Sequence, residues 1–407
     1  MKTPISEDQV RAAMESVMDP ELGASIVELG MLTSVEIGAK TITIGIALTT
    51  AGCPLKHQLK TDITTQIESL GATQSVRIEF GEMNQEQRSA VMDTARKVAQ
   101  ERAPMTMIPR RTRVIAVASG KGGVGKSSVT ANLAASFALQ GNRVGILDAD
   151  IWGFSIPPMF GINDRLGGHD GMIDPNVVTV GTGAIEIVSM GFLVEDGSTA
   201  LMWRGLMLAK AVEQFLTDVR WGDLDVLLID LPPGTGDVQM ALARLLPQTA
   251  VVVVTTPARI AQVVASRVAD MARRSHLRVV GVIENMSAYI DEDGASHEIF
   301  GSGGGNELAT QLGVPFLGSV PIEPEIARAG DGALPIAVTS PDSSGAKAIE
   351  AIAHLLDDAL PHAAALASCT ARIDDLLLSI QRGDTRLDPE APDGGGGLSG
   401  STALPEA

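Results

Sequence analysis

The chain has 407 residues, of which 45% are hydrophobic and only 3% aromatic, so aliphatic side chains must fill a core large enough for more than one domain. Its formal net charge of −18 argues against a surface that binds nucleic acid or an anionic membrane. No apolar run of about 20 residues and no secretory signal is visible, and Cys53 and Cys369 are too few for a disulfide framework, so we expect a cytoplasmic, reducing location.

Residues 1–82 predict a small α/β domain with the order helix, two strands, helix, strand. Ser6 and Gln9 match a capping box, and Val10, Met14, Val17 and Met18 follow as one apolar helical face. The later elements are β-rich runs at 31–37 and 41–48 with a glycine turn between them, a helix from about 55 that ends before Gly71, and a strand at 76–80.

Residues 83–112 predict a polar helix at 84–102 and then a proline-containing linker. The linker ends in a basic cluster formed by Arg110, Arg111 and Arg113. These arginines could bind phosphate or an acidic partner, but a solvated linker is the simpler interpretation of so short a charged run.

From residue 113 to 362 short apolar runs alternate with helical stretches. The runs lie at 114–118, 144–147, 226–229, 250–255 and 279–283, and a late helix is predicted at 346–359. The runs at 114–118 and 250–255 are almost continuously apolar, as in strands buried on both faces. The pattern predicts a mainly parallel, doubly wound α/β sheet. In the remaining tail, 363–407, we expect disorder from about residue 385 because glycine, proline and acidic residues dominate.

A glycine-rich loop follows the first apolar run. It reads Gly120-Lys121-Gly122-Gly123-Val124-Gly125-Lys126-Ser127 and fits G-x-x-x-x-G-K-[ST] between an apolar strand and an Ala-rich helix. Its backbone N–H groups would surround the phosphates of ATP, Lys126 would reach the β- and γ-phosphates, and Ser127 would bind Mg²⁺. The eight residues together predict a P-loop nucleotide site.

Acidic residues end two of the later apolar runs, where carboxylates would lie near the phosphates. Asp150 is the candidate to orient or deprotonate the attacking water, with Asp148 as its partner or alternative. Asp230 is expected to hold Mg²⁺ through water. Residues 231–237 follow and predict a glycine-hinged switch that senses the γ-phosphate.

These motifs resemble the Mrp/ApbC group of iron–sulfur cluster carrier ATPases, within the wider class of MinD, ParA and the nitrogenase iron protein. The matching stretches are 120–127, 148–153, Trp203-Arg204-Gly205, 230–237, 284–287 and 297–305. In the first 82 residues, Asp19-Pro20-Glu21-Leu22 and 49–54 resemble the small cluster-assembly domain often fused to this ATPase. The likeness covers about residues 5–360.

The resemblance implies a deviant Walker A ATPase, a homodimer that binds an iron–sulfur cluster and hands it on to apoprotein clients or works with assembly factors. It implies that Lys121 crosses the dimer interface to the partner's nucleotide and that Asn285 contacts the adenine. Membrane- and DNA-binding members of the wider class need a basic amphipathic helix or a basic surface, which this acidic chain does not offer, so we expect no membrane or nucleic-acid partner.

One feature of the family is missing from the sequence. The family usually carries C-x-x-C just after the Glu-Asn-Met-Ser segment, but residues 288–296 contain no cysteine. Asp291, Glu292 and Asp293 in that segment could hold a hard cation, although a solvated acidic turn is the simpler interpretation. His297 is expected to hydrogen-bond in a loop and not to bind metal.

Cys53 is the candidate to replace the missing ligands. It lies at a predicted helix N-terminus with Pro54 in the first helical position, where the helix dipole favours a thiolate, and His57 lies one turn further on. An ordinary buried cysteine beside a surface histidine explains the same pattern. Two functions therefore stay open, an ATP-hydrolysing cluster carrier and an ATP-switched adaptor for cluster-assembly clients that holds no cluster itself.

Overall fold

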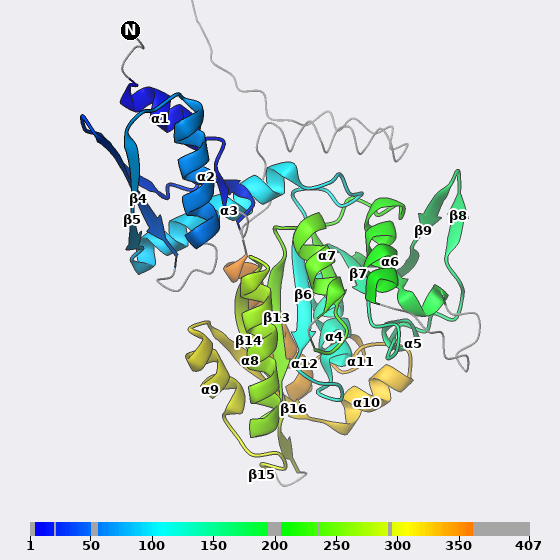
Figure 1. Cartoon of the computed structure of the whole chain (residues 1–407). Helices are drawn as coiled ribbons and strands as arrows, with labels where there is room; N and C mark the ends of the chain where they lie inside the picture. The colour runs from blue at the N-terminus through cyan, green and yellow to red at the C-terminus, as the bar shows by residue number, and fades with distance from the viewer. Residues whose placement is uncertain are drawn as a thin grey trace, which may run out of the picture.

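The structure, a computed structural model, describes residues 5–19, 22–49, 56–193, 205–234, 236–291 and 295–360. Figure 1 shows a small α/β unit at the N-terminal side, a larger α/β unit built on one sheet, and a long helix between the two. This architecture confirms the predicted fold class.

The small unit packs two helices against a three-stranded sheet. Its elements are α1 (Glu7–Met14), β1 (Met18–Asp19), β2 (Ala24–Ser25), β3 (Leu32–Ile37), β4 (Thr41–Leu48), α2 (Lys56–Ser69) and β5 (Ser75–Glu82). Strand β3 is antiparallel to β4, and β4 is parallel to β5. The predicted helix, two strands, helix and strand are all present in that order, but the short pair β1 and β2 was not predicted. Gly71 adopts the left-handed conformation expected after α2.

The first helix begins as predicted but ends earlier. The Ser6 hydroxyl accepts from the backbone N–H of Gln9, and the Gln9 side chain accepts from the N–H of Ser6, which confirms the capping box. The prediction that Val17 and Met18 extend the helical face was wrong. Met18 instead pairs with Ser25 in the β1–β2 ladder, which leaves its side chain 41% exposed.

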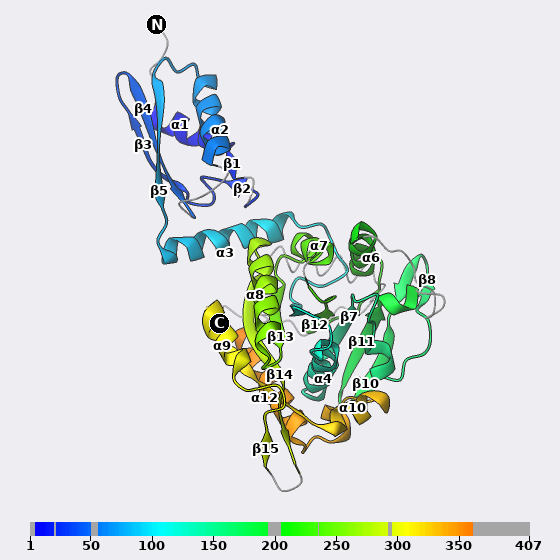
Figure 2. The ribbon, with the colours of Figure 1, turned by 60° about the horizontal axis from the view of Figure 1, so that its bottom comes forward.

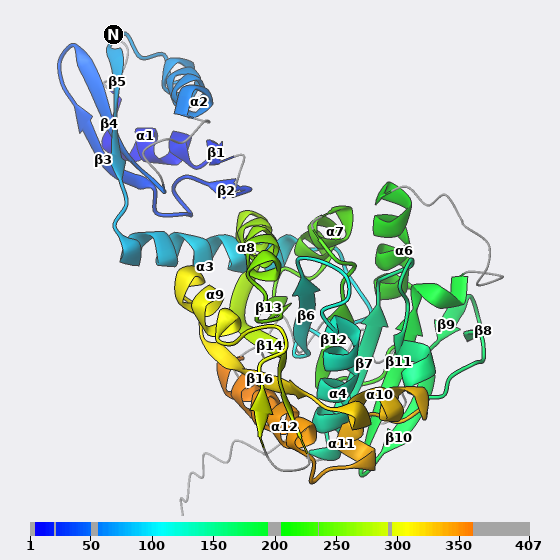
Figure 3. The same cartoon turned by 90° about the horizontal axis from the view of Figure 1, so that it is seen from below.

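Helix α3 (Gln85–Arg102) connects the two units, and its predicted range is confirmed. Val91, Ala95 and Val98 join the core of the small unit. Arg96 on the same helix donates a hydrogen bond from Nε to the backbone oxygen of His276, 2.9 Å away, just after α8 (Arg259–Arg274). Figures 2 and 3 show α3 passing the end of α8. Division of the chain at residue 82 stays a prediction.

The large unit is built on a nine-stranded sheet. The strands of this unit are β6 (Arg113–Ser119), β7 (Arg143–Asp148), β8 (Gly167–His169), β9 (Met172–Asp174), β10 (Asn176–Val180), β11 (Gly183–Ser189), β12 (Val226–Asp230), β13 (Ala250–Thr255), β14 (Arg278–Ile290), β15 (Ser296–His297) and β16 (Phe316–Ile322). The order is β10-β11-β7-β12-β6-β13-β14-β15, with β16 paired to β14, and β8 and β9 form a separate hairpin. All pairings from β11 to β14 and the β14–β16 pairing are parallel. The chain passes from β6 to β7 toward one edge of the sheet and from β12 to β13 toward the other edge. A crevice opens at the carboxyl end of β6, where these two directions separate.

Helices cover both faces of this sheet. They are α4 (Lys126–Leu139), α5 (Ile156–Met159), η1 (Met190–Leu193), α6 (Gly205–Thr217), α7 (Asp237–Leu245), α8, α9 (Gly304–Leu312), α10 (Pro324–Asp331), α11 (Ile336–Thr339) and α12 (Ser344–Ala359). Alternate residues of β6 belong to two different cores, because successive side chains of a strand point to opposite faces. Val114 and Ala116 pack with α6 to α9, whereas Ile115 and Val117 pack with α4, α11 and α12.

The structure differs from the sequence prediction at the margins of the large unit. Strands β8 to β11 and β16 were not predicted, because glycine and polar residues interrupt their apolar runs. The interpretation of the basic cluster as a solvated linker was wrong for Arg113, which belongs to β6 and pairs with Asp357 at the end of α12. Arg111 pairs with Asp223 at the surface. Among the described helices, none is both long and apolar enough to cross a membrane.

Candidate functional site

The glycine-rich loop joins the carboxyl end of β6 to α4, at the crevice of the sheet. Gly123 and Gly125 have φ values of 79° and 77°, a left-handed conformation that side chains disfavour. A Cβ atom on Gly125 would lie 2.2 Å from Nδ2 of Asn285. That same Nδ2 donates a 2.8 Å hydrogen bond to the backbone oxygen of Val124, so β14 holds the loop in shape.

Lys126, Ser127 and Asp230 meet beneath this loop. Nζ of Lys126 lies 2.7 Å from Oδ2 of Asp230, with side chains only 6% and 1% exposed. The Ser127 hydroxyl donates to the same Oδ2 at 2.6 Å. Hydroxyl and carboxylate oxygens are the ligands that Mg²⁺ prefers, so Ser127 and Asp230 fit the metal role expected from the sequence. The lysine supplies the buried positive charge that a phosphate needs.

The two acids of the second motif lie beside this cluster. Asp148 and Asp230 are direct neighbours across the β7–β12 pairing. Burial, and next the charge of Asp230, raise the pKa of Asp148 to about 7, although Ser189 Oγ and the N–H of Asp150 donate to its carboxylate at 2.9 and 3.2 Å. Burial also raises the pKa of Asp150, and Lys126 opposes that shift. Both acids therefore bind a proton more readily than ordinary aspartates do.

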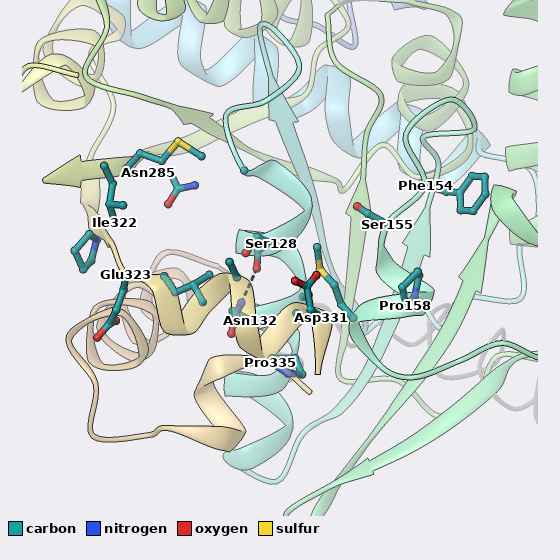
Figure 4. Close-up of a pocket in the computed structure, with 18 residues that line it drawn as sticks. Ser128, Asn132, Phe154, Ser155, Pro158, Asn285, Ile322, Glu323, Asp331 and Pro335 are labelled. Atoms are coloured by element: carbon teal, nitrogen blue, oxygen red, sulfur yellow. Dashed lines mark hydrogen bonds between the residues drawn. The ribbon is translucent and has the colours of Figure 1, made fainter. Parts of the chain in front are cut away.

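A cavity of about 510 Å³ opens along α4 next to the loop (Figure 4). Its walls come from Gly125, Ser128, Ala131, Asn132, Phe154, Ser155, Pro158, Met159, Asn285, Met286, Pro321, Ile322, Glu323, Ile326, Ala327, Gly330, Asp331 and Pro335. In Figure 4, Asn285, Ile322 and Glu323 lie on one side, and Phe154, Ser155 and Pro158 on the other. The size and the mainly apolar walls suit a nucleoside.

Asn285 is therefore placed where a base bound in the cavity would meet it. The residue after it, Met286, has φ 58°, a rare conformation for a side chain of this size and one that clusters at binding sites. Sequence reasoning missed the other walls, chiefly Ser128 and Asn132 on α4 and residues 321–323 at the carboxyl end of β16. A signal was present, because 321–323 lie where the last parallel strand of the sheet ends.

Other predicted residues lie outside this cluster. Lys121 is exposed. Cys53, residues Pro20–Glu21 and Trp203–Arg204 of the matched segments, and Glu292 and Asp293 of the acidic turn lie outside the described residues. His57 is on α2 of the small unit. No group of three or more His, Cys, Asp or Glu suited to a metal occurs within the ranges that the structure describes.

The position of the missing C-x-x-C is a hairpin between β14 and β15. The His297 Nε2 atom lies 2.7 Å from Oδ2 of Asp291, and the other carboxylate oxygen of Asp291 accepts from the N–H of Ala295 at 2.8 Å. The ring of Tyr289 lies 6.2 Å from that of His297. As predicted, His297 hydrogen-bonds within this loop.

Two family models match the chain, and together they cover most of it. The model described as NUBPL iron-transfer P-loop NTPase matches residues 110–356, and the one described as iron-sulfur cluster assembly protein matches residues 7–80.

Two similar proteins cover more than four fifths of the chain. A relative named iron-sulfur cluster carrier protein from Mycobacterium tuberculosis is 43% identical over 352 residues, which cover 84% of this chain and 91% of the relative. One of the same name from Deinococcus radiodurans is 39% identical, over 86% of this chain and 94% of its own length. A solved nucleotide-binding protein from Archaeoglobus fulgidus, in complex with ADP, is 35% identical with a TM-score of 0.48, over 58% of this chain and 91% of its own. The chain therefore belongs to the family of NUBPL-type iron-transfer P-loop NTPases, whose relatives here are named iron–sulfur cluster carrier proteins.

Proposed function

We propose that the chain binds and hydrolyses ATP as a homodimer in the cytoplasm, and uses this cycle to bind iron–sulfur clusters and transfer them to target apoproteins. The observation that carries the proposal is the buried Lys126–Asp230 ion pair, with Ser127 on the same carboxylate oxygen, under a glycine loop. A buried lysine next to exposed backbone N–H groups is an anion site, and the neighbouring cavity provides room for the nucleoside.

The expected cycle follows from the contacts around Lys126. When ATP binds, its β- and γ-phosphates would replace Asp230 as the partner of Lys126. Ser127 and Asp230 would then hold Mg²⁺, which neutralises charge on the phosphates. Asp150, whose pKa is raised, would orient the attacking water and accept its proton.

The outer side of the loop supports pairing with a second copy of the chain. Gly120 packs directly against the backbone of α8 at Val264 and Ala265. On the exposed side of that helix Ile260 and Val263 are 70% and 52% exposed, and Lys121, the residue after Gly120, is exposed as well. Exposed apolar side chains on α8 and an exposed lysine in the loop that packs against it suit a contact in which each Lys121 reaches the nucleotide of the partner subunit.

Nucleotide binding is tested first. Lys126→Ala should abolish binding of a fluorescent ATP analogue, since it removes the charge that meets the phosphates. Lys347→Ala removes an exposed lysine of α12 and should leave binding at the wild-type level. Tight binding by the Lys126 variant would refute the site.

The dimer is tested by mass in solution. With a non-hydrolysable ATP analogue, light scattering should give twice the monomer mass for wild type and for Val177→Asp, which changes a valine that is 61% exposed on the edge strand β10. Val263→Asp should stay a monomer. Equal masses for both variants would refute a contact through α8.

Cluster binding is supported by the iron-transfer family and by the cluster-assembly match over residues 7–80, which includes Cys53. Anaerobic reconstitution of wild type, Cys53→Ser and Cys369→Ser, read by thiolate-to-iron absorbance, tests it. We expect a cluster in wild type and Cys369→Ser and a loss in Cys53→Ser. An undiminished cluster in Cys53→Ser would exclude Cys53 as a ligand.

One observation favours a second function, an ATP-switched adaptor for cluster-assembly clients that holds no cluster. The hairpin where the family carries its cysteines is closed here by Asp291 and His297. Neither side chain offers the thiolate that a cluster requires. A wild-type protein that binds ATP but takes up no iron and sulfide on reconstitution would establish the adaptor.

A further inference from the structure

Thr130 makes a contact to Asp230 that the P-loop motif does not contain. It lies on α4, one turn after Ser127, and is fully buried. Its Oγ1 is 2.8 Å from Oδ1 of Asp230. Lys126 and Ser127 both contact the opposite oxygen, Oδ2. Thr130 therefore contacts Oδ1 of Asp230, the carboxylate oxygen that Lys126 and Ser127 do not contact.

The hydroxyl of Thr130 must be the donor in this contact. Oγ1 also lies 3.0 Å from the backbone oxygen of Lys126, so two acceptors compete for one hydrogen. Asp230 is paired with a lysine and carries no hydrogen of its own in its ionised form. The Thr130 hydroxyl donates to Asp230, which is the charged and the closer of the two acceptors, because hydrogen bonds to ionised groups are about twice as strong as neutral ones.

The contact becomes more important when nucleotide enters. With nucleotide bound, Lys126 would turn from Asp230 to the phosphates, and Ser127 would turn its oxygen to Mg²⁺. Asp230 would then lose both of its present donors on Oδ2. Thr130 needs no such movement, because its backbone is fixed inside α4 and its side chain is enclosed. A β-branched side chain in a helix also has few rotamers to explore.

We propose that Thr130 is a positioning residue, which keeps the Asp230 carboxylate oriented toward Mg²⁺ after Lys126 has moved to the phosphates; this inference rests on the proposed function. Thr130 acts through Asp230 and need not touch the nucleotide. Removal of the Thr130 hydroxyl should reduce the factor by which Mg²⁺ increases the affinity for ATP. The affinity for ATP without Mg²⁺ should stay unchanged.

The test is equilibrium binding of a non-hydrolysable ATP analogue, measured with Mg²⁺ and with a chelator. The ratio of the two dissociation constants gives the Mg²⁺ gain without any turnover. Thr130→Val keeps the shape and removes the hydroxyl, Thr130→Ser restores the hydroxyl, and Thr112→Val removes another buried hydroxyl, one bonded to the backbone oxygen of Leu224. If the valine variant does not fold, Thr130→Ala takes its place.

We expect the Mg²⁺ gain of Thr130→Val to fall about ten-fold, which corresponds to one hydrogen bond to a charged group. Thr130→Ser and Thr112→Val should keep the wild-type gain. A wild-type gain in Thr130→Val, or no recovery in Thr130→Ser, would overturn the inference. Wild type that binds no analogue at all would instead refute the proposed function.

Discussion

Replacing Asp148 by asparagine should change how the stability of the large unit depends on pH. Asp148 is fully buried next to Asp230, and its pKa is raised to about 7, chiefly by burial, from 3.8 in an unfolded chain. The asparagine side chain would keep the shape of the aspartate and its place next to Ser189, but it could not ionise. The comparison isolates the free energy of placing a charge at this position.

The sign follows from proton binding. Between pH 3.8 and 7 the unfolded chain has lost the Asp148 proton while the folded chain keeps it. The folded state therefore binds more protons, and the free energy of unfolding falls as pH rises. One proton corresponds to about 1.4 kcal/mol per pH unit, so wild type should lose about 3 kcal/mol relative to Asp148→Asn between pH 5 and pH 8, with the loss complete above pH 7.

The assay is denaturant unfolding without nucleotide, followed by tryptophan fluorescence. All three tryptophans, Trp152, Trp203 and Trp221, fall within residues 113–362, and Trp221 is fully buried, so the signal reports the large unit. Asp164→Asn makes the same chemical change at an exposed position. Its free energy of unfolding should depend on pH in the same way as that of wild type. Parallel curves for wild type and Asp148→Asn across this pH range would refute the reasoning, because they would mean that Asp148 is ionised in the folded protein.

Two further predictions concern the loop. Gly125→Ala should weaken ATP binding at least ten-fold, since its φ of 77° and the 2.2 Å approach to Asn285 leave no room for a methyl group, whereas Gly81→Ala, in open space on β5, should bind like wild type. Normal affinity in a nucleotide titration of Gly125→Ala would show that the loop adapts. Lys121→Ala should bind ATP normally but hydrolyse it about a thousand-fold more slowly, as expected for a charge supplied in trans to the transition state. Unchanged phosphate release would remove Lys121 from the reaction.

Much of the site was predictable from residues that are close along the chain. Lys126 and Ser127 belong to one contiguous loop, and Asp230 ends a short apolar run, so local patterns indicated their chemistry. The structure brings these three side chains together at 2.6–2.7 Å. Their roles with nucleotide and Mg²⁺ stay predictions.

Most of the cavity walls and the third contact of Asp230 were not predictable in this way. The walls come from the glycine loop, α4, α5, β14, β16 and α10, and of the lining residues only Gly125 and Asn285 were expected from the sequence to contact nucleotide. Thr130 looks like any helix residue in the sequence. Its role is visible only because α4 packs beside β12 and places its hydroxyl 2.8 Å from Asp230.

A P-loop protein with a small α/β unit ahead of a parallel sheet could be predicted from the sequence, because loop chemistry and strand periodicity depend on neighbours in the chain. Which strands lie next to each other depends on the folded arrangement. The pairing of β7 with β12 buries Asp148 and places it next to Asp230, and burial first, then the charge of Asp230, raises the pKa of Asp148. Charge interactions depend on distance and burial in space, and neither can be read from spacing along a chain.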